Sequence, residues 1–443
     1  MTPTQFREPP LLQPGDLLTG ELSGAVVAVG EMIGLGAQGQ VFRAHFVNSF
    51  DSNPQALKIY KPAYLKLDAA APARVRGLSH ARIPSHQFIW PRETVVAFGG
   101  SGFGYLMALK EDRFRSVNDL LSGRINPTRY AIASAAWEIA DSFLRLHAAG
   151  YYYRDINTSN ITLDPLTGEI RIFDCDNIAW GQSPSPLSGT GEFAAPEIWR
   201  REAQPSMYTD LHSLAVLLFL LLVVQRPLQG KRENLPRYAG KDGELLLFGT
   251  EPLFIFDPKD TSNRPDPMHH QNANICWPAL PAWIRNLFIQ AFTDGLWRPK
   301  NGRVGVDTWL RAMGRLSDSI FACAECGAEN YFDEEFLKSN RTLPPCWQCR
   351  QTPPLPARMR VGTHIVILTG GKKIQTRYID PTLLPEIVAT VTAGPPALVN
   401  DSLCAWRVKF ADQSVATVEP GATLPLAGVD AIQFGSIQGR VRL

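Results

Sequence analysis

The sequence predicts an α+β protein in which a small β-rich lobe precedes a larger helical lobe, with two smaller modules after them. Three observations lead to this prediction. After an N-terminal extension of residues 1–19, strand-like runs with glycine-containing turns fill residues 20–109, whereas long helical periods dominate residues 110–318. Two C-x-x-C pairs lie within residues 319–354. Short apolar runs separated by Gly, Pro and Asp turns fill residues 355–443, as in an all-β domain.

Length, composition and charge restrict the class of protein. A chain of 443 residues exceeds one ordinary core, and 45% hydrophobic with 19% charged residues is a globular composition. The formal net charge of +2 provides no field suited to nucleic acid or an anionic membrane. The longest apolar run, Leu214–Val224, has 11 residues where ~20 cross a bilayer, so it predicts a buried helix. Because residues 1–18 do not resemble a signal peptide, we expect a cytoplasmic protein without nucleic-acid or membrane partners.

A glycine-rich segment and a lysine form the first candidate site. Residues 33–41 fit G-x-G-x-x-G-x-V, in which glycines let backbone amides approach phosphate oxygens. A hairpin turn alone would explain these glycines equally well, but strand-like residues flank both sides, unlike a dinucleotide motif that opens a helix. Lys58 follows Val41 by seventeen residues, a spacing that suits an ammonium group on the α- and β-phosphates. A lone lysine in a strand is more often a solvated edge residue. The assignment of Lys58 to the phosphates therefore depends on its spacing from the glycine-rich segment.

Three oxygen-bearing side chains form the second candidate site. The run Tyr153–Asn160 matches H-R-D-x-x-x-x-N except at its first position. Phosphoryl transfer requires a carboxylate that orients the substrate hydroxyl and accepts its proton, and Asp155 is placed to supply it. Asn160 is expected to bind one Mg²⁺ (or Mn²⁺). Asp174 follows a strand-like run at the place of D-F-G and is expected to bind the bridging metal ion.

A further motif makes a family resemblance plain. The run Gly189–Glu197 contains an A-P-E segment preceded by Gly-Thr. With it, the order of the motifs resembles that of eukaryotic-type protein kinases over about residues 20–316. The resemblance implies a bilobal protein kinase fold, with ATP between the lobes and transfer of the γ-phosphate to Ser or Thr hydroxyls. A small-molecule kinase of related fold is disfavoured because such enzymes usually lack this A-P-E segment.

The resemblance also implies roles for single residues. The catalytic residues are Asp155 and Lys58. The ATP-binding residues are Gly34, Gly36, Gly39, Val41, Ala56, Lys58 and Met107. The structural residues are Arg154, Glu197, Asp210, which braces the catalytic loop, and Arg298, which pairs with Glu197. The activation loop carries Ser183, Ser185, Ser188 and Thr190, and Thr190 is the threonine typical of Ser/Thr kinases.

Three positions depart from the family pattern in or beside the catalytic motifs. Tyr153 replaces the usual histidine, a scaffolding position at which we expect little loss. Asn157 stands where Ser/Thr kinases usually have a lysine near the γ-phosphate, and the missing charge is expected to lower the rate. Asp176 replaces the glycine of D-F-G, where its carboxylate could repel phosphate, contact a metal ion or change the flexibility of the loop.

A fourth departure concerns the partner of Lys58. No glutamate occurs between residues 59 and 92, where the family has a helix glutamate, and Asp68 is the only acidic residue there. Three possibilities follow: Asp68 reaches Lys58, another group holds Lys58, or a partner protein assembles the lobe. A pseudokinase scaffold that assembles a partner complex is therefore the alternative function. The presence of the lysine and of the three oxygen-bearing side chains favours an active kinase.

The serine residues of the activation loop suggest regulation. A phosphate on Ser183, Ser185 or Ser188 could pair with Arg154 and order the loop. A plain Ser/Pro-rich loop explains the same residues equally well.

The late cysteines predict a structural zinc ribbon. Cys323 and Cys326 form one pair, Cys346 and Cys349 the other, and 19 residues separate the pairs, which suits one tetrahedral Zn²⁺ site. Four thiolates fill the coordination shell, so a catalytic zinc is not expected. A redox dithiol would need a thioredoxin-like setting that neither pair has.

The C-terminal modules connect the chain to a subgroup of kinases. Residues 355–443 carry no catalytic motif, and we expect them to dock partners. The whole order of modules is similar to bacterial kinases of tellurite-resistance-linked triads, which accompany a von Willebrand A protein and a metal-dependent phosphatase. The points of likeness are Phe88–Pro91, Gly104–Met107, Gly189–Glu197 and the trailing cysteines. The resemblance implies that the von Willebrand A protein is the substrate.

Overall fold

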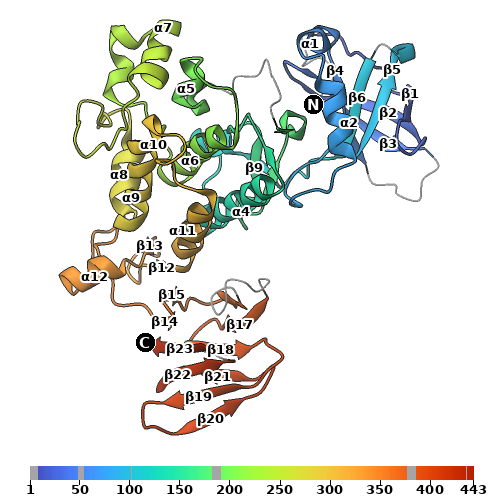
Figure 1. Cartoon of the computed structure of the whole chain (residues 1–443). Coiled ribbons are helices and arrows are strands. Elements are labelled where there is room, and N and C mark those ends of the chain that lie inside the picture. Colours follow the sequence, from blue (N-terminus) through green and yellow to red (C-terminus); the bar gives the residue numbers. More distant parts are fainter. Residues whose placement is uncertain (1–7, 48–53, 101, 182–190, 377–385, 436) are drawn as a thin grey trace. The chain divides into compact units, whose positions relative to one another are not determined.

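The first lobe is a small closed barrel with two helices. The computed structural model describes residues 8–47, 54–100, 102–181, 191–376, 386–435 and 437–443 (Figure 1). The barrel strands follow the order β1-β2-β3-β4-β6-β5. Their bounds are β1 (Leu17–Gly20), β2 (Val26–Leu35), β3 (Gly39–Phe46), β4 (Gln55–Tyr60), β5 (Glu93–Ala97) and β6 (Gly102–Ala108). Alternate side chains of each strand point inward and form a buried apolar core that includes Val27, Phe42, Leu57 and Leu106.

Two short helices, α1 (Pro62–Leu67) and α2 (Ala71–Ser79), connect β4 to β5. Pro72 lies in the first turn of α2, where the missing N–H costs no helical hydrogen bond. The helix therefore begins one residue before the proline and is not broken by it. Its buried face carries Arg74, Val75 and Leu78.

The second lobe is mainly helical. Its helices are α3 (Val117–Leu121), α4 (Arg129–Ala148), α5 (Pro196–Trp199), α6 (Met207–Val223), α7 (Gly240–Leu245), α8 (Gln271–Ala279), α9 (Ala282–Ala291), α10 (Asp294–Trp297) and α11 (Val306–Asp318). Residues 209–210 and 212–223 of α6 are all buried, so the predicted buried helix is confirmed. Short strands line the start of this lobe: β7 (Arg115–Ser116), β8 (Tyr151–Tyr152), β9 (Ile161–Leu163), β10 (Ile170–Ile172) and β11 (Ala179–Trp180).

The chain divides into two compact units. The first comprises Met1–Pro127, Ala135–Asn272 and Phe288–Trp309, and the second comprises Thr128–Ser134, Ala273–Leu287 and Leu310–Leu443. The glycine-rich segment, Lys58, Asp155, Asn160 and Asp174 all lie in the first unit. In the described parts of the chain, no helix has both the length and the apolar character that a membrane crossing requires.

Besides parts of α4, α8, α9 and α11, the second unit contains a small hairpin, a short helix and two sheets. The hairpin is β12 (Ile320–Ala322) with β13 (Glu329–Tyr331), followed by α12 (Glu334–Asn340). One sheet has the order β15-β14-β23-β22-β19-β20 and the other β16-β17-β18-β21. Their bounds are β14 (Arg358–Val361), β15 (His364–Ile367), β16 (Lys373–Gln375), β17 (Ile387–Val391), β18 (Ala397–Asn400), β19 (Trp406–Phe410), β20 (Val415–Val418), β21 (Thr423–Pro425), β22 (Val429–Phe434) and β23 (Ile437–Arg442). Both sheets contribute to one buried core, which includes Met359, Leu398 and Trp406, so this region is strand-rich as expected.

Candidate active site

The glycine-rich segment is a tight hairpin between β2 and β3. The N–H of Gly36 donates to the carbonyl of Gly39 at 2.9 Å. A Cβ added at Gly39 would lie 2.3 Å from the carbonyl oxygen of Ile59, so only glycine lets β4 approach here. At Gly36 an added Cβ would meet no atom closer than 3.8 Å outside its neighbours. Glycine at Gly36 is thus not required by packing within the described chain.

Apolar side chains beside this hairpin suit an adenine ring. Ala56 on β4 stands directly opposite Met107 on β6, and Val41 on β3 stands opposite Lys58. Ala56 and Met107 are buried in one cluster, against which Val41 and Ile33 pack. The structure therefore brings together the residues that the resemblance names around the nucleotide.

Lys58 is buried and has three side-chain partners. Its ammonium donates to Oε1 of Gln38 at 2.7 Å, to Oδ1 of Asp174 at 3.3 Å and to both carboxylate oxygens of Asp176 at 2.9 and 3.1 Å. Burial alone would lower the pKa of Lys58, but the charges of Asp174 and Asp176 outweigh burial and raise it above its ordinary value. The lysine is held as a cation at the place where the phosphates are expected.

Asp176 is the main anionic partner of Lys58. Its carboxylate is buried and also accepts hydrogen bonds from the hydroxyl groups of Tyr60 and, at 2.8 Å, Tyr105. Burial alone would raise the pKa of Asp176, yet the charge of Lys58 and these hydrogen bonds hold it below its ordinary value. The sequence left three possibilities for this carboxylate: repelling phosphate, contacting a metal ion or changing the flexibility of the loop. An ion pair with the lysine was not among them. Both tyrosines were missed because hydroxyl groups in strands give no sequence signal.

Asp68 does not reach Lys58. It lies 2.8 Å from the guanidinium of Arg74 in a buried ion pair, and the Nε of Arg74 also donates to the backbone carbonyl of Asp176 at 3.0 Å. Of the three possibilities left by the missing glutamate, the structure shows the second, in which another group holds Lys58. The short helix α2 contacts the segment that supplies this group through Arg74.

The catalytic loop brings Asp155 and Asn160 together. Nδ2 of Asn160 donates to Oδ2 of Asp155 at 3.2 Å and to its carbonyl at 3.0 Å. Oδ1 of Asn157 accepts from the backbone N–H groups of Ser159 and Asn160 at 2.8 and 3.2 Å. This is an Asx-type turn, so the asparagine that replaces the family lysine shapes the loop.

Asp174 lies beside this loop and close to Lys58. The N–H of Phe173 donates to the carbonyl of Asn160 at 2.8 Å, which joins the two segments. Asp174 has φ of 51°, a left-handed conformation that aspartate tolerates better than most residues. Lys58 lowers the pKa of Asp174, but burial and the charges of Asp176 and Asp155 prevail and raise it.

Two residues, Asp210 and Tyr153, hold the catalytic loop in place through hydrogen bonds. The carboxylate of Asp210 on α6 accepts from the backbone N–H groups of Tyr153 and Arg154 at 2.6 and 3.0 Å, and from His147 at 3.1 Å. The hydroxyl of Tyr153 donates to the carbonyl of Phe173. A tyrosine at the usual histidine position therefore connects the loop to the residue before Asp174.

Arg154 is buried with an incomplete set of partners. Its Nε donates to the carbonyl of Asn177, whereas its two terminal nitrogens have no hydrogen-bond partner among the described residues. Burial and the nearby Arg74 lower the pKa of Arg154. It also adopts a left-handed conformation with φ of 73°. The candidate phosphate acceptors Ser183, Ser185 and Ser188, together with Thr190, lie outside the described residues.

The prediction that Arg298 pairs with Glu197 is wrong. Glu197 forms a buried, bidentate ion pair with Arg303, whose terminal nitrogens lie 2.8 and 2.7 Å from its carboxylate oxygens. Arg298 is exposed and pairs with Asp294 instead. Both arginines come after the short helix α10. The path of the backbone after this helix determines which of the two guanidinium groups is buried. The sequence carried no signal that distinguishes the two.

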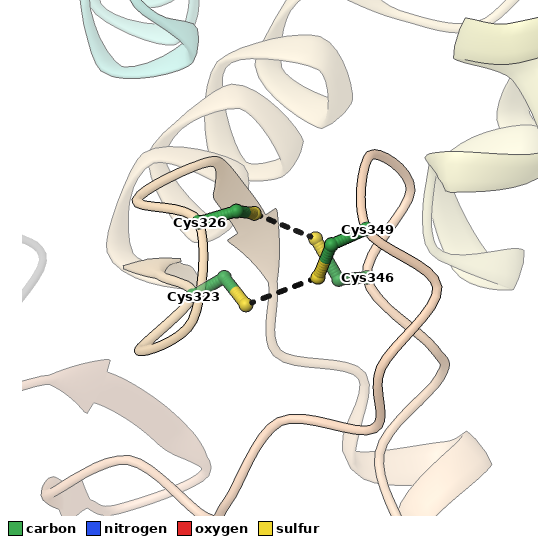
Figure 2. A group of neighbouring side chains, drawn as sticks. All are labelled: Cys323, Cys326, Cys346 and Cys349. Carbon is green, nitrogen blue, oxygen red and sulfur yellow. Dashed lines mark hydrogen bonds between the residues drawn. The ribbon is translucent and has the colours of Figure 1, made fainter.

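The four late cysteines converge in the second unit (Figure 2). Sγ of Cys323 lies 3.8 Å from that of Cys349, and Sγ of Cys326 lies 3.7 Å from that of Cys346. All four sulfur atoms lie within 4.8 Å of one another, so the cluster could hold a metal ion.

The two cysteine turns have the same backbone form. The N–H groups of Cys323 and Cys346 each donate at 2.8 Å to the carbonyl five residues later, in Ala328 and Gln351. Gly327 and Arg350 follow the second cysteine of each turn with φ of 74° and 65°. This repetition is expected of two knuckles that face one ligand.

The comparisons with known proteins agree with this geometry. A family model described as the protein kinase domain matches residues 27–268. The chain belongs to the protein kinase family.

Curated relatives of the kinase include two ribosomal protein S6 kinases. It is 31% identical over 209 residues to the putative ribosomal protein S6 kinase alpha-1 of Caenorhabditis elegans, covering 46% of this chain and 26% of that protein. It is 30% identical over 234 residues to the ribosomal protein S6 kinase 2 alpha of Gallus gallus, covering 49% and 30%. The kinase thus spans less than a third of the length of these relatives, and their names as kinases agree with the predicted enzyme, a protein kinase.

Proposed function

We propose that this kinase transfers the γ-phosphate of ATP to Ser or Thr hydroxyls of a protein substrate. The observation that carries the proposal is the gathering of Asp155, Asn160 and Asp174 beside the buried ammonium of Lys58. These are the groups that phosphoryl transfer requires, a carboxylate for the substrate hydroxyl, oxygen ligands for a cation and a fixed positive charge.

Each group has a role in this proposal. Asp155 orients the hydroxyl and accepts its proton. The amide nitrogen of Asn160 donates a hydrogen bond to Asp155, so its amide oxygen remains for a cation. Asp174 supplies a carboxylate oxygen to the same cation. Such oxygen ligands suit Mg²⁺ or Mn²⁺, which would neutralise charge on the phosphates. Lys58 contacts the α- and β-phosphates, and Ala56 and Met107 pack on the adenine.

The direct test is a labelled-ATP transfer assay with the full chain and Asp155→Asn. We expect the variant to lose transfer by about 10³-fold, because general-base groups contribute on that order. Asp141→Asn, which removes a carboxylate of α4 that pairs with Arg145, is the matched control and should keep full activity. Signal that persists in Asp155→Asn would come from a contaminating kinase. Absence of transfer to every candidate acceptor would favour the pseudokinase scaffold.

We also propose that phosphorylation of the activation loop regulates the kinase. The buried terminal nitrogens of Arg154, without partners among the described residues, support this, because a phosphate oxygen would satisfy them. After incubation with Mg-ATP, mass spectrometry should find phosphate on Ser183, Ser185 or Ser188, and activity should rise. Arg154→Gln should accept the phosphate but lose the rise in activity. An unmodified loop in a fully active enzyme would contradict this proposal.

The cysteine cluster is proposed to bind one structural Zn²⁺ in a zinc ribbon. With Zn–S bonds of about 2.3 Å, an ideal tetrahedron places its sulfur atoms about 3.8 Å apart. Two sulfur pairs of the cluster, at 3.7 and 3.8 Å, support this ligand set.

The substrate is proposed to be a von Willebrand A domain protein, with a cognate phosphatase reversing the modification, in a bacterial signalling system. The sequence resemblance to triad kinases supports this, and the zinc and β modules would recruit the partner. The same transfer assay with a von Willebrand A domain protein as acceptor tests it. Transfer that is unaffected by deletion of residues 355–443 would exclude recruitment through the β module.

A further inference from the structure

Four arginines form a square on one face of the C-terminal domain. β14 and β23 are neighbouring strands (Figure 1). They pair antiparallel, and their register places Arg358 opposite Arg442 and Arg360 opposite Arg440. The residues between them on the two strands are buried, so the four guanidinium groups share the other, outward face. Like charges directly opposite one another destabilise a sheet. Two such pairs side by side therefore need a reason other than folding.

The square borders a hollow that also has an apolar wall. The cavity has a volume of about 310 Å³. Besides the four arginines it is lined by Lys338 and Glu334 of α12 and by the apolar side chains Phe332, Leu337 and Ile365. Five cationic side chains thus share this cavity with one carboxylate. All of them belong to the second unit.

The cationic charge is only partly neutralised within the chain. Arg360 and Lys338 share the single carboxylate of Glu334, and Arg442 pairs with Asp430 at 3.1 Å. Among the residues that the structure describes, Arg358 and Arg440 have no carboxylate within ion-pair distance. Arg358 instead lies over the ring of Phe332, 5.6 Å from its centroid. Burial first, and then the charges of Arg442 and Arg360, lower the pKa of Arg358 against the opposing effect of Glu334.

We propose that the hollow bordered by the arginine square binds a phosphorylated Ser or Thr side chain of a protein segment. A phosphate carries close to two negative charges and three acceptor oxygens, and paired guanidinium groups match it with bidentate hydrogen bonds. The apolar wall would receive a neighbouring apolar side chain of the same segment. A volume of about 310 Å³ suits one or two side chains and not a polyanion such as nucleic acid.

This site would let the kinase bind a protein that it, or another kinase, has already phosphorylated. The inference rests on the proposed function only in its choice of a phosphoryl group over other dianions. It involves none of the residues assigned to catalysis, so binding at this site and phosphoryl transfer are separate properties of the chain.

The test measures binding of the full chain to degenerate peptide libraries that differ only at a central phosphoserine or serine. We expect clear retention of the phosphorylated library alone. Arg358→Gln combined with Arg440→Gln should weaken binding at least ~10-fold, as expected when charge-assisted bidentate contacts are lost. Arg407→Gln, which removes an exposed arginine of β19 in the same sheet, is the matched control and should bind normally. Leu337→Ser should weaken peptide binding but not binding of free phosphoserine.

Several outcomes would overturn the proposal. These are equal retention of both libraries, absence of retention, or retention that saturating free phosphoserine does not reduce. Binding to vesicles that contain phosphatidylserine, without binding to phosphopeptides, would identify a membrane surface instead. Asp155→Asn should bind the phosphorylated library like the unaltered chain, so a failure of the kinase proposal would not be mistaken for a failure of this one.

Discussion

Replacing Asp176 with glycine, the residue that D-F-G has at this position, should inactivate the kinase instead of improving it. Lys58 would lose its closest carboxylate and keep only Asp174, at 3.3 Å, and Gln38. Asp174 is also the proposed metal ligand, so the lysine and the cation would compete for it. We expect kcat to fall about 100-fold, the order found when one preorganised electrostatic group is removed. Asp176→Asn should behave similarly, because it keeps the shape but not the charge.

The same substitutions should lower stability, and a control must separate the two effects. Breaking a buried ion pair by removing one partner costs about 3–5 kcal/mol, and the hydroxyl groups of Tyr60 and Tyr105 would also lose an acceptor. Asp164→Asn is the matched control, because Asp164 is also buried and pairs with Arg113 at 3.0 Å, outside the proposed catalytic set. It should lower the melting temperature without lowering kcat. Full activity of Asp176→Gly at a temperature where it is folded would show that Lys58 is positioned by other groups.

The motifs that the sequence could place are those in which chemistry fixes the spacing along the chain. Asp155 and Asn160 are five residues apart on one loop, and the structure joins their side chains by a hydrogen bond. Lys58 was found because a glycine-rich hairpin predicts a lysine on the next strand. In both cases short-range order along the chain carries the information.

The contacts that escaped prediction join residues far apart in sequence. The carboxylate of Asp176 meets hydroxyl groups 116 and 71 positions earlier in the chain, in Tyr60 and Tyr105. The residues next to Asp176 in the sequence do not indicate these two partners. The sequence showed only that an aspartate stands where D-F-G has a glycine. Arg303 likewise pairs with Glu197 across 106 positions. Burial and strand pairing decide such partners, and a single sequence specifies neither directly.

The C-terminal domain shows the same limit in its sheets. Alternating apolar residues predicted a strand-rich region, and the two sheets with a shared core agree with it. The pairing of β14 with β23 brings together the first and last strands of that domain. Alternation says which residues face outward on each strand, but it does not say which strands are neighbours. The four arginines were therefore unremarkable until the register placed them in a square.

Removing the metal from the cysteine cluster should unfold the zinc module. Among the described residues, the small apolar cluster that this module forms with β15 has four buried members, Phe321, Phe332, Leu343 and Ile367, too few to hold a fold without another constraint. Structural zinc sites supply about 10–16 kcal/mol, so Cys346→Ser should lower the melting temperature of this region strongly and abolish metal binding. Elemental analysis should find one zinc ion in the unaltered chain and none in the variant. Cys404→Ser, at an exposed cysteine outside the cluster, should change neither property.

The loss of zinc should also loosen the first turn of α4. The carboxylate of Glu329, on strand β13 of the hairpin whose turn carries the first cysteine pair, accepts from the N–H groups of Arg129 and Tyr130 at the start of this helix. The guanidinium of Arg129 lies 5.2 Å from the ring centroid of Tyr331 and 4.9 Å from that of Trp347. Hydrogen exchange of residues 129–134 should therefore rise in Cys346→Ser and not in Cys404→Ser. Unchanged exchange after complete loss of zinc would mean that the hairpin keeps its form without the metal ion, and that the cysteines do not stabilise this end of the helix.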